Sequence, residues 1–209
     1  MKTLKRWAGQ FVLWISGWKT EGELPSNKKF VMIAAPHTSN WDLVYMLAVA
    51  YVFKLDVSWL GKHSLFKGVF GWFMRWLGGI PVDRSGNKNY VEQIRTVFEE
   101  RETLFLAVPP AGTRSKRDYW KSGFYYIAQA ANVPIVMGFL DFKRKVGGVG
   151  PAFVPTGDVK ADMDVFRAFY SKVTGKFPDK TSRIRLRVED EDNNANESSN
   201  NQEADKVAS

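Results

Sequence analysis

Short apolar runs alternate along this chain with segments whose apolar residues recur every three or four positions. The first pattern is typical of buried strands and the second of amphipathic helices. The predicted strands span 28–36, 56–62, 80–84, 102–112, 134–142 and 182–189, and the predicted helices span 38–53, 87–100, 123–133 and 162–177. Strands that alternate with helices indicate βαβ units, so we expect an α/β fold with a mostly parallel central sheet flanked by helices.

Two segments interrupt this alternation. Residues 65–79 are strongly aromatic and end in paired glycines. They suit either an ordinary core or a surface that houses acyl chains or contacts a bilayer. Residues 143–157 predict a hairpin with a glycine-rich turn.

The N-terminal segment predicts an amphipathic helix over residues 3–19. Its apolar residues are spaced three or four apart: Leu4, Trp7, Phe11, Trp14, Ile15 and Trp18. Basic residues flank them: Lys2, Lys5, Arg6 and Lys19. A basic helix with tryptophans on its apolar face can lie in the headgroup layer of an anionic membrane. The alternative is a helix packed on the domain's own core.

The composition divides the chain into three parts. Residues 1–22 form the predicted membrane-interface helix, and residues 23–189 form an α/β domain. From residue 190 to 209 the chain is acidic and polar, without an apolar cluster. Such a segment cannot bury enough surface to offset its ordering entropy, so we expect a disordered tail.

Charge and residue usage limit the possible partners. The formal net charge is +8, but seven acidic residues and one lysine lie from residue 189 onward, which leaves +14 on residues 1–188. A body this basic favours lipid headgroups, phosphorylated substrates or nucleic acid. The chain has no cysteine, which excludes disulfides, and its two histidines argue against a zinc site. It has neither an apolar run long enough to span a bilayer nor a signal-peptide cleavage site, so we expect an intracellular protein.

The stretch HTSNWD places His37 five residues before Asp42. On one regular helix their side chains would diverge by about 140°. If His37 lies in the loop after a strand and Asp42 in the first helical turn, the two can meet. A carboxylate on one imidazole nitrogen leaves the other free to act as a general base. Taken alone, the spacing favours a buried ring beside a helix cap, and His63, without such an aspartate, is interpreted as structural.

Basic residues follow two other predicted strands. Arg84 is the last residue of the segment predicted as a strand at 80–84, and Arg114 and Lys116 follow Gly112 after the strand at 102–112. Ligands bind at strand ends in α/β sheets, glycine allows close backbone approach, and the guanidinium group suits phosphate. The alternative for each loop is a turn with solvated charges.

Together these segments resemble the glycerolipid acyltransferase family, the lysophosphatidic acid acyltransferase-like enzymes. The H-x4-D block of that family is matched by His37 and Asp42, and its G-x-I-P-V-D-R block by Gly78 to Arg84. The F-P-E-G-T-R-S block is matched by Val108 to Ser115, and an apolar V-P-I-V run by Val133 to Val136. The blocks occur in the family's order and cover roughly residues 28 to 145.

The resemblance implies that an acyl thioester, either acyl-CoA or acyl carrier protein, gives its acyl chain to the hydroxyl of a lysophospholipid-like acceptor. His37 would be the general base and Asp42 would orient it. The residues implied in binding the acceptor's phosphate or polar head are Arg84, Gly112, Thr113, Arg114, Ser115 and Lys116. No metal or other cofactor is implied. The enzyme would be a peripheral protein on the cytoplasmic side of an anionic membrane.

One position departs from the family pattern, because Ala111 stands where the third block normally carries glutamate. The acceptor could therefore differ, for example an ornithine lipid or a glycolipid, the enzyme could be weak, or the residue could be an alteration. Two other functions stay open: a thioesterase or lipid hydrolase, and a membrane-surface binding module without activity. Nucleic acid is not expected, because the basic segment 182–189 lacks aromatic residues for base stacking.

Overall fold

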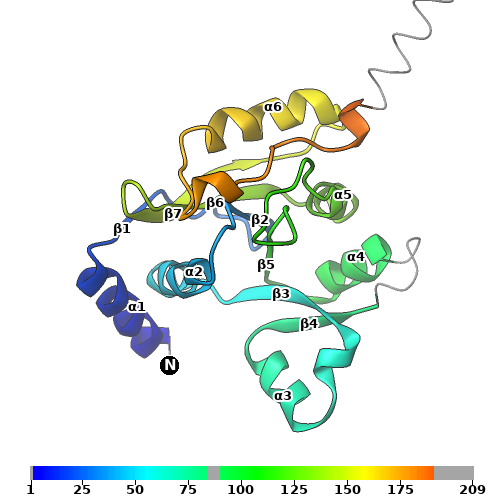
Figure 1. Ribbon diagram of the computed structural model, residues 1–209. Helices are drawn as coiled ribbons and strands as arrows, with labels where there is room; N and C mark the ends of the chain where they lie inside the picture. The colour runs from blue at the N-terminus through cyan, green and yellow to red at the C-terminus, as the bar shows by residue number, and fades with distance from the viewer. Residues whose placement is uncertain (1, 84–89, 191–209) are drawn as a thin grey trace, which may run out of the picture.

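The computed structural model describes residues 2–83 and 90–190, and in these ranges a seven-stranded sheet forms the centre of the molecule (Figure 1). The strands are β1 (Lys19–Glu21), β2 (Lys29–Ala35), β3 (Val57–Lys62), β4 (Gly79–Val82), β5 (Leu104–Val108), β6 (Ile135–Asp141) and β7 (Val146–Phe153). Their order in the sheet is β1-β7-β6-β2-β5-β3-β4.

The sheet is mostly parallel, which confirms the fold class predicted from the sequence. Strands β6, β2, β5, β3 and β4 run in one direction, whereas β7 is antiparallel to β6 and β1 runs with β7. In the register of the central pair, Ile33 of β2 lies opposite Val108 of β5. The loops that follow these two strands therefore leave the same edge of the sheet side by side.

Helices cover both faces of the sheet. They are α1 (Lys2–Ser16), α2 (Trp41–Val52), α3 (Gly68–Trp76), α4 (Tyr90–Glu100), α5 (Gly123–Ala130) and α6 (Val159–Tyr170), with short 3₁₀ turns η1 (His63–Phe66) and η2 (Pro178–Lys180). Alternate residues of β2 point to opposite faces. Val31 and Ile33 pack in the core shared with α4, α5 and α6, and Phe30 and Met32 pack in the core on the α2 side.

Helix α1 packs on α2 and exposes its tryptophans. Gly9 lets the two helices approach, because a Cβ at this position would lie 2.6 Å from the carbonyl oxygen of Ala48. Trp18, just after the helix, is buried and stacks on Tyr45 with ring centroids 4.2 Å apart. The remaining apolar residues predicted for this face are exposed: Leu4, Trp7, Phe11, Trp14 and Ile15. Within the described ranges, no helix is long and apolar enough to cross a bilayer.

The strand predicted at 182–189 is wrong. This segment contributes only an isolated bridge between Leu186 and Trp120. Its alternation is nevertheless real, because Leu186 is fully buried and Ile184 and Val188 pack against the same core. Alternation reports that one side of an extended segment is buried, and here the segment is buried against a loop rather than in a sheet.

Other boundaries also differ from the prediction, and the helix predicted over 3–19 ends at Ser16. Helix α6 begins earlier than residue 162, because Asp158 caps it by accepting a hydrogen bond from the Ala161 amide at 3.0 Å, and it ends at Tyr170 rather than 177. The predicted hairpin is formed by β6 and β7, but the glycines lie in β7 rather than in the turn. A Cβ at Gly148 would lie 2.0 Å from the carbonyl oxygen of Glu21, so glycine here admits β1, a strand that the pattern did not predict.

Candidate active site

His37 and Asp42 meet at the carboxyl end of β2. Strand β2 ends at Ala35, His37 lies in the following loop, and Asp42 is the second residue of α2. The imidazole Nδ1 lies 3.1 Å from Oδ2 of Asp42. The same carboxylate oxygen accepts hydrogen bonds from the backbone amides of Thr38 at 2.7 Å and Ser39 at 2.8 Å. The backbone amides therefore hold the Asp42 carboxylate in position independently of its contact with the imidazole.

The two side chains differ in burial. Asp42 is 1% exposed, whereas the His37 side chain is 23% exposed and lines a large cavity. A carboxylate on Nδ1 favours the tautomer with hydrogen on that nitrogen, which leaves the lone pair on Nε2. Nε2 can then accept a proton from a group bound in the cavity.

Segments distant in sequence hold the His37 loop in place. The Phe177 amide donates a hydrogen bond to the Thr38 hydroxyl at 3.2 Å, and the chain at Gly175 passes close to the same side chain. On the other side of the loop, the guanidinium group of Arg114 donates to the side-chain oxygen of Asn40. The loops after β2 and β5 are thus linked by side chains of two of the sequence blocks.

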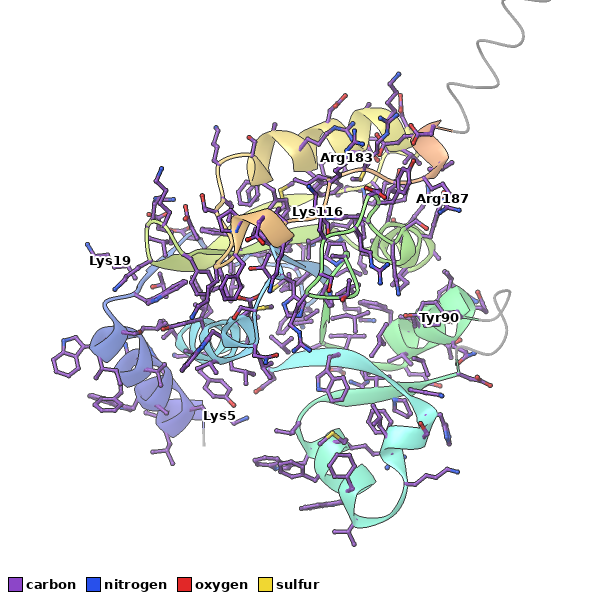
Figure 2. All side chains as sticks on the ribbon, in the orientation of Figure 1. Lys5, Lys19, Tyr90, Lys116, Arg183 and Arg187 are labelled. Atoms are coloured by element: carbon purple, nitrogen blue, oxygen red, sulfur yellow. The ribbon has the colours of Figure 1, made fainter. Side chains whose placement is uncertain are left out.

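The loop after β5 brings Gly112 to the cavity. Gly112 has a φ of +64° and lines the cavity wall. A Cβ at this position would lie 2.8 Å from Cε of Lys121, so the lysine side chain lies directly against the glycine. The other residues predicted to bind the acceptor lie outside the wall: Thr113, Arg114, Ser115 and Lys116. Of these, Arg114, Ser115 and Lys116 are exposed, and Figure 2 labels Lys116 on this loop.

Arg84, the remaining predicted binding residue, lies outside the described residues. The strand that precedes it, β4, ends at Val82 beside the end of β3, with Val82 opposite Lys62. The backbone amide of Asp83, the residue before Arg84, donates a hydrogen bond to the side-chain oxygen of Gln93 on α4 at 3.2 Å.

The cavity beside His37 has a volume of about 1410 Å³ and two different walls. One wall is apolar and comes from α2, β3 and α3; it includes Leu43, Leu47, Trp59, Met74 and Leu77. A second wall comes from the chain after β5 and from the segment before residue 190; it includes Arg117, Tyr119, Lys121 and Arg187. The cavity can therefore hold an apolar chain and a charged group at the same time.

Lys121 and Arg187 were not among the residues predicted to bind substrate. Lys121 precedes α5 in the sequence WKSG. The only feature of the sequence that pointed to a binding role for this lysine was its short separation from Gly112 along the chain. Arg187 occupies a polar position of the alternating segment that predicted a strand. Both were missed because their places in the cavity depend on contacts between distant parts of the chain.

Ala111 faces a second, smaller cavity. This cavity has a volume of about 30 Å³ and is lined by Ala111, His37, Trp120 and Thr181, among others. Ala111 is buried and does not line the larger cavity. The position that departs from the family pattern is therefore buried and shares the lining of a small cavity with His37. Among the residues that the structure describes, no group of three or more histidine or carboxylate side chains could hold a metal ion.

Comparisons with known proteins agree on one family. A family model described as Acyltransferase matches residues 19–137. The 1-acyl-sn-glycerol-3-phosphate acyltransferase of Streptococcus pneumoniae is 29% identical over 116 residues, which cover 54% of this chain and 42% of that protein. The mouse (Mus musculus) 1-acyl-sn-glycerol-3-phosphate acyltransferase epsilon is 31% identical over 113 residues, which cover 48% of this chain and 29% of that protein. The chain thus spans less than half the length of these relatives.

One solved structure has the same fold. It is the crystal structure of the 1-acyl-sn-glycerophosphate (LPA) acyltransferase from Thermotoga maritima. The likeness covers 82% of this chain and 78% of that chain, with a TM-score of 0.57 and 16% sequence identity. The helices and strands described above are therefore arranged as in that protein.

Proposed function

This chain belongs to the acyltransferase family, and on that premise we propose that it transfers a fatty acyl group from a thioester to the hydroxyl of a lysophospholipid, with His37 as the general base. The observation that carries the proposal is the His37–Asp42 contact of 3.1 Å beside a cavity that has one apolar and one cationic wall. This arrangement offers a base, a place for an acyl chain and a place for an anionic group.

The proposed reaction needs no nucleophile from the protein. Nε2 of His37 takes the proton of the acceptor hydroxyl while the hydroxyl oxygen attacks the thioester carbonyl carbon. Asp42 holds Nδ1–H and stabilises the imidazolium that forms. The tetrahedral intermediate then collapses, the carbon–sulfur bond breaks, and the leaving thiolate takes the proton back from the imidazolium. The products are the ester and the free thiol, and His37 returns to its starting state.

The acceptor proposed first is lysophosphatidate, since the names of the relatives specify 1-acyl-sn-glycerol 3-phosphate as the substrate of those proteins. The chain carries alanine rather than glutamate at position 111, so we propose an ornithine lipid or a glycolipid as the alternative acceptor. The residues implied by the family pattern, Arg84 and 112–116, would hold the acceptor's polar head in either case.

An assay that separates transfer from hydrolysis tests this function. Purified protein is given palmitoyl-CoA with and without lysophosphatidate, thiol release is followed, and lipid products are identified by mass spectrometry. Release that depends on the acceptor, with phosphatidate as product, supports the proposal. Release that is independent of any acceptor would identify a thioesterase instead. A parallel panel of lyso-ornithine lipid and glycolipid acceptors decides between the two acceptor classes.

We also propose that the protein is peripheral to an anionic membrane on its cytoplasmic side. Apolar side chains on three helices support this: exposed ones include Trp7 and Trp14 on α1, Leu43 on α2, and Phe70 and Trp72 on α3. Exposed Arg6 and Lys67 adjoin α1 and α3 and suit anionic headgroups. In Figure 1, α6 lies on the other side of the sheet from α1 and α2.

Vesicle sedimentation tests the membrane contact. The triple variant Trp7→Ser, Phe11→Ser, Trp14→Ser should lose most of its binding to phosphatidylglycerol vesicles. A matched variant with Val154→Ser and Val165→Ser, which replaces exposed apolar residues elsewhere, should bind as the original chain does. Equal sedimentation of the two variants would contradict the contribution of α1.

A further inference from the structure

The cationic side chains of the large cavity are confined to one wall. Among the described lysines and arginines, those that line the cavity are Arg117, Lys121 and Arg187. Arg117 and Lys121 belong to the chain between β5 and α5, and Arg187 belongs to the segment that follows η2. His37 lines the same cavity as this wall and as the apolar residues of α2, β3 and α3.

These three cations lack carboxylate partners within the described ranges, unlike other arginines of the chain. Arg144 pairs with Glu21, and Arg167 pairs with Asp164 and Glu189. No ion pair is formed by Arg117, Lys121 or Arg187 with any described residue, although Asp118 lies in the same wall. Like charges gathered in a cavity repel one another, and a bound anion removes that repulsion.

Backbone hydrogen bonds hold the cationic wall together. The Trp120 amide donates to the Arg185 carbonyl at 2.8 Å, and the Arg183 amide donates to the Arg117 carbonyl at 3.1 Å. The Lys121 amide donates to the Pro110 carbonyl at 2.8 Å. These bonds fix the segment 183–187 against the loop 117–121. The backbone that carries the three cations is therefore fixed before any ligand binds.

Side-chain contacts add to this order. The Arg187 guanidinium carbon lies 5.6 Å from the centroid of the Tyr119 ring, and the Tyr119 hydroxyl donates to Asp190 at 2.7 Å. The Lys121 side chain lies against Gly112. The wall thus presents two guanidinium groups and one ammonium group to a cavity that also contains the imidazole of His37.

We propose that Arg117, Lys121 and Arg187 form a phosphate-ester site, and that its ligand is the coenzyme A portion of the acyl donor. The identity of the ligand rests on the acyl transfer proposed above. Coenzyme A carries a diphosphate and a separate ribose monophosphate, which suits several cations spread along a wall better than a single headgroup phosphate does. With the phosphates on this wall and the acyl chain on the apolar wall, the thioester lies between them, beside His37.

Direct binding of coenzyme A tests the site without requiring turnover. Isothermal titration calorimetry should show Kd raised roughly tenfold by Arg117→Gln and by Arg187→Gln, as expected for loss of one charge-assisted contact. The matched control is Arg183→Gln, because Arg183 is exposed on the same segment but lies outside the cavity wall (Figure 2). It should leave Kd unchanged. If both cavity variants bind coenzyme A as the Arg183 variant does, the site is wrong.

Kinetics with a shortened donor distinguish the donor from the acceptor. S-palmitoyl-N-acetylcysteamine keeps the thioester but has no phosphate, so Arg187→Gln should raise KM for palmitoyl-CoA roughly tenfold and leave KM for the short donor unchanged. KM for lysophosphatidate should also stay unchanged. A raised KM for lysophosphatidate with both donors would contradict the donor assignment, because the site would then hold the acceptor. An effect confined to palmitoyl-acyl carrier protein would contradict it as well.

Failure of the proposed function gives a different result. If the chain shows no acyl transfer but still binds coenzyme A through Arg117 and Arg187, the phosphate-ester site stands and the proposed function is wrong. If the chain has normal transfer activity but its Arg117 and Arg187 variants bind coenzyme A as Arg183→Gln does, the proposed function stands and the phosphate-ester site is wrong. Thermal unfolding of each variant, measured in parallel, shows that the comparison is made between folded proteins.

Discussion

Two buried carboxylates of this protein, Asp42 and Glu189, hold nitrogen-bearing side chains in different ways. Asp42 is 1% exposed and Glu189 is 4% exposed. Both accept a hydrogen bond from a backbone amide, and both contact one nitrogen-bearing side chain: Asp42 contacts His37, and Glu189 contacts Arg167 at 2.7 Å. The starting arrangement is therefore similar, and the difference lies in the partner.

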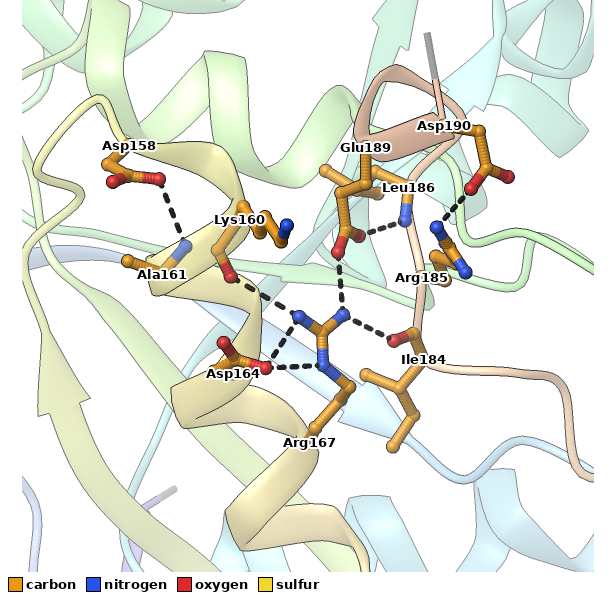
Figure 3. A network of polar contacts seen from close by, with 10 residues as sticks. All are labelled: Asp158, Lys160, Ala161, Asp164, Arg167, Ile184, Arg185, Leu186, Glu189 and Asp190. Atoms are coloured by element: carbon orange, nitrogen blue, oxygen red, sulfur yellow. Dashed lines mark hydrogen bonds and ion pairs between the residues drawn. The ribbon is translucent and has the colours of Figure 1, made fainter. Parts of the chain in front are cut away.

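The partner of Glu189 has its hydrogen-bond donors engaged by the protein. Figure 3 shows the Arg167 guanidinium group between Glu189, Asp164 and the carbonyl oxygens of Ile184 and Lys160. A group held in this way connects α6 to the C-terminal segment, and all of its hydrogen-bond donors are engaged by the protein. The partner of Asp42 is different, because one imidazole nitrogen is engaged and the ring lines a cavity. The comparison teaches that the open nitrogen, rather than the buried carboxylate, distinguishes the proposed general-base pair from a structural one.

The largest effect is expected from removing Nε2 of His37, the imidazole nitrogen that does not contact Asp42. His37→Ala should lower kcat/KM for acyl transfer by about 10⁴-fold, since it removes the proposed general base. The free energy of unfolding should change little, because the ring is partly exposed. Steady-state kinetics and urea denaturation measure the two quantities. Activity that survives in this variant would refute the assigned base.

The next effect is loss of the negative charge that orients His37. Asp42→Asn should lower kcat by roughly 10²- to 10³-fold, because the amide cannot stabilise the imidazolium. KM for palmitoyl-CoA should stay within about twofold, since Asp42 does not line the cavity. A variant with unchanged kcat would show that Asp42 only caps the loop through the Thr38 and Ser39 amides.

The third effect concerns the Arg167–Glu189 pair. Its loss should lower the free energy of unfolding and leave the activity unchanged. Arg167→Met leaves the buried Glu189 without its cation, which should lower the free energy of unfolding by about 3 kcal/mol. kcat should be retained below the melting temperature. The control is Arg95→Met, which removes an arginine paired on the surface with Glu92 and Glu99 and should leave stability nearly unchanged. A loss of kcat in the Arg167 variant without unfolding would contradict the division between the two pairs.

The smallest effect concerns a third buried carboxylate, Asp162, whose partner is neutral. The Tyr125 hydroxyl donates to Asp162 at 2.7 Å, and Tyr125→Phe should lower the free energy of unfolding by about 1–2 kcal/mol at neutral pH. Burial, together with the hydrogen bond to Asp162, raises the pKa of Tyr125 from 10.0 to about 12.

The raised pKa of Tyr125 gives this last prediction a pH dependence. A folded-state pKa above the unfolded value means that the stabilisation is fully present below pH 10 and is lost as the pH rises toward about 12. The difference in unfolding free energy between the original chain and Tyr125→Phe should therefore shrink over this range. Urea denaturation at several pH values measures it, and a difference that stays constant would contradict the assigned hydrogen bond.

Strands with both faces covered were predictable because burial on both faces leaves a continuous apolar run. Strands β2 and β6 lie within the predicted ranges for this reason. Strand β1 was not predictable, since its three residues, Lys19–Glu21, are polar and form a strand only because Gly148 lets them approach β7. The segment 182–189 shows the reverse error, since a strand was predicted there and the structure has none. Its alternation reflects burial against a loop.

By itself, the sequence determined the types of chemistry available to this protein. The spacing of His37 and Asp42 across a strand end and a helix start showed that the two side chains can meet, and the other sequence blocks of the family turned this into a prediction. The same holds for Gly112, whose loop follows a buried strand.

Only the tertiary structure decided which charged residues serve the cavity and which serve the fold. Arg167 and Arg187 lie in the same basic part of the sequence, yet one is enclosed by carboxylates and carbonyls and the other lines the cavity. The physical reason is that a charge is either paired or open according to neighbours that lie far away in the chain. Spacing along the sequence carries no information about those neighbours, because the sheet order and the path of the C-terminal segment bring them together.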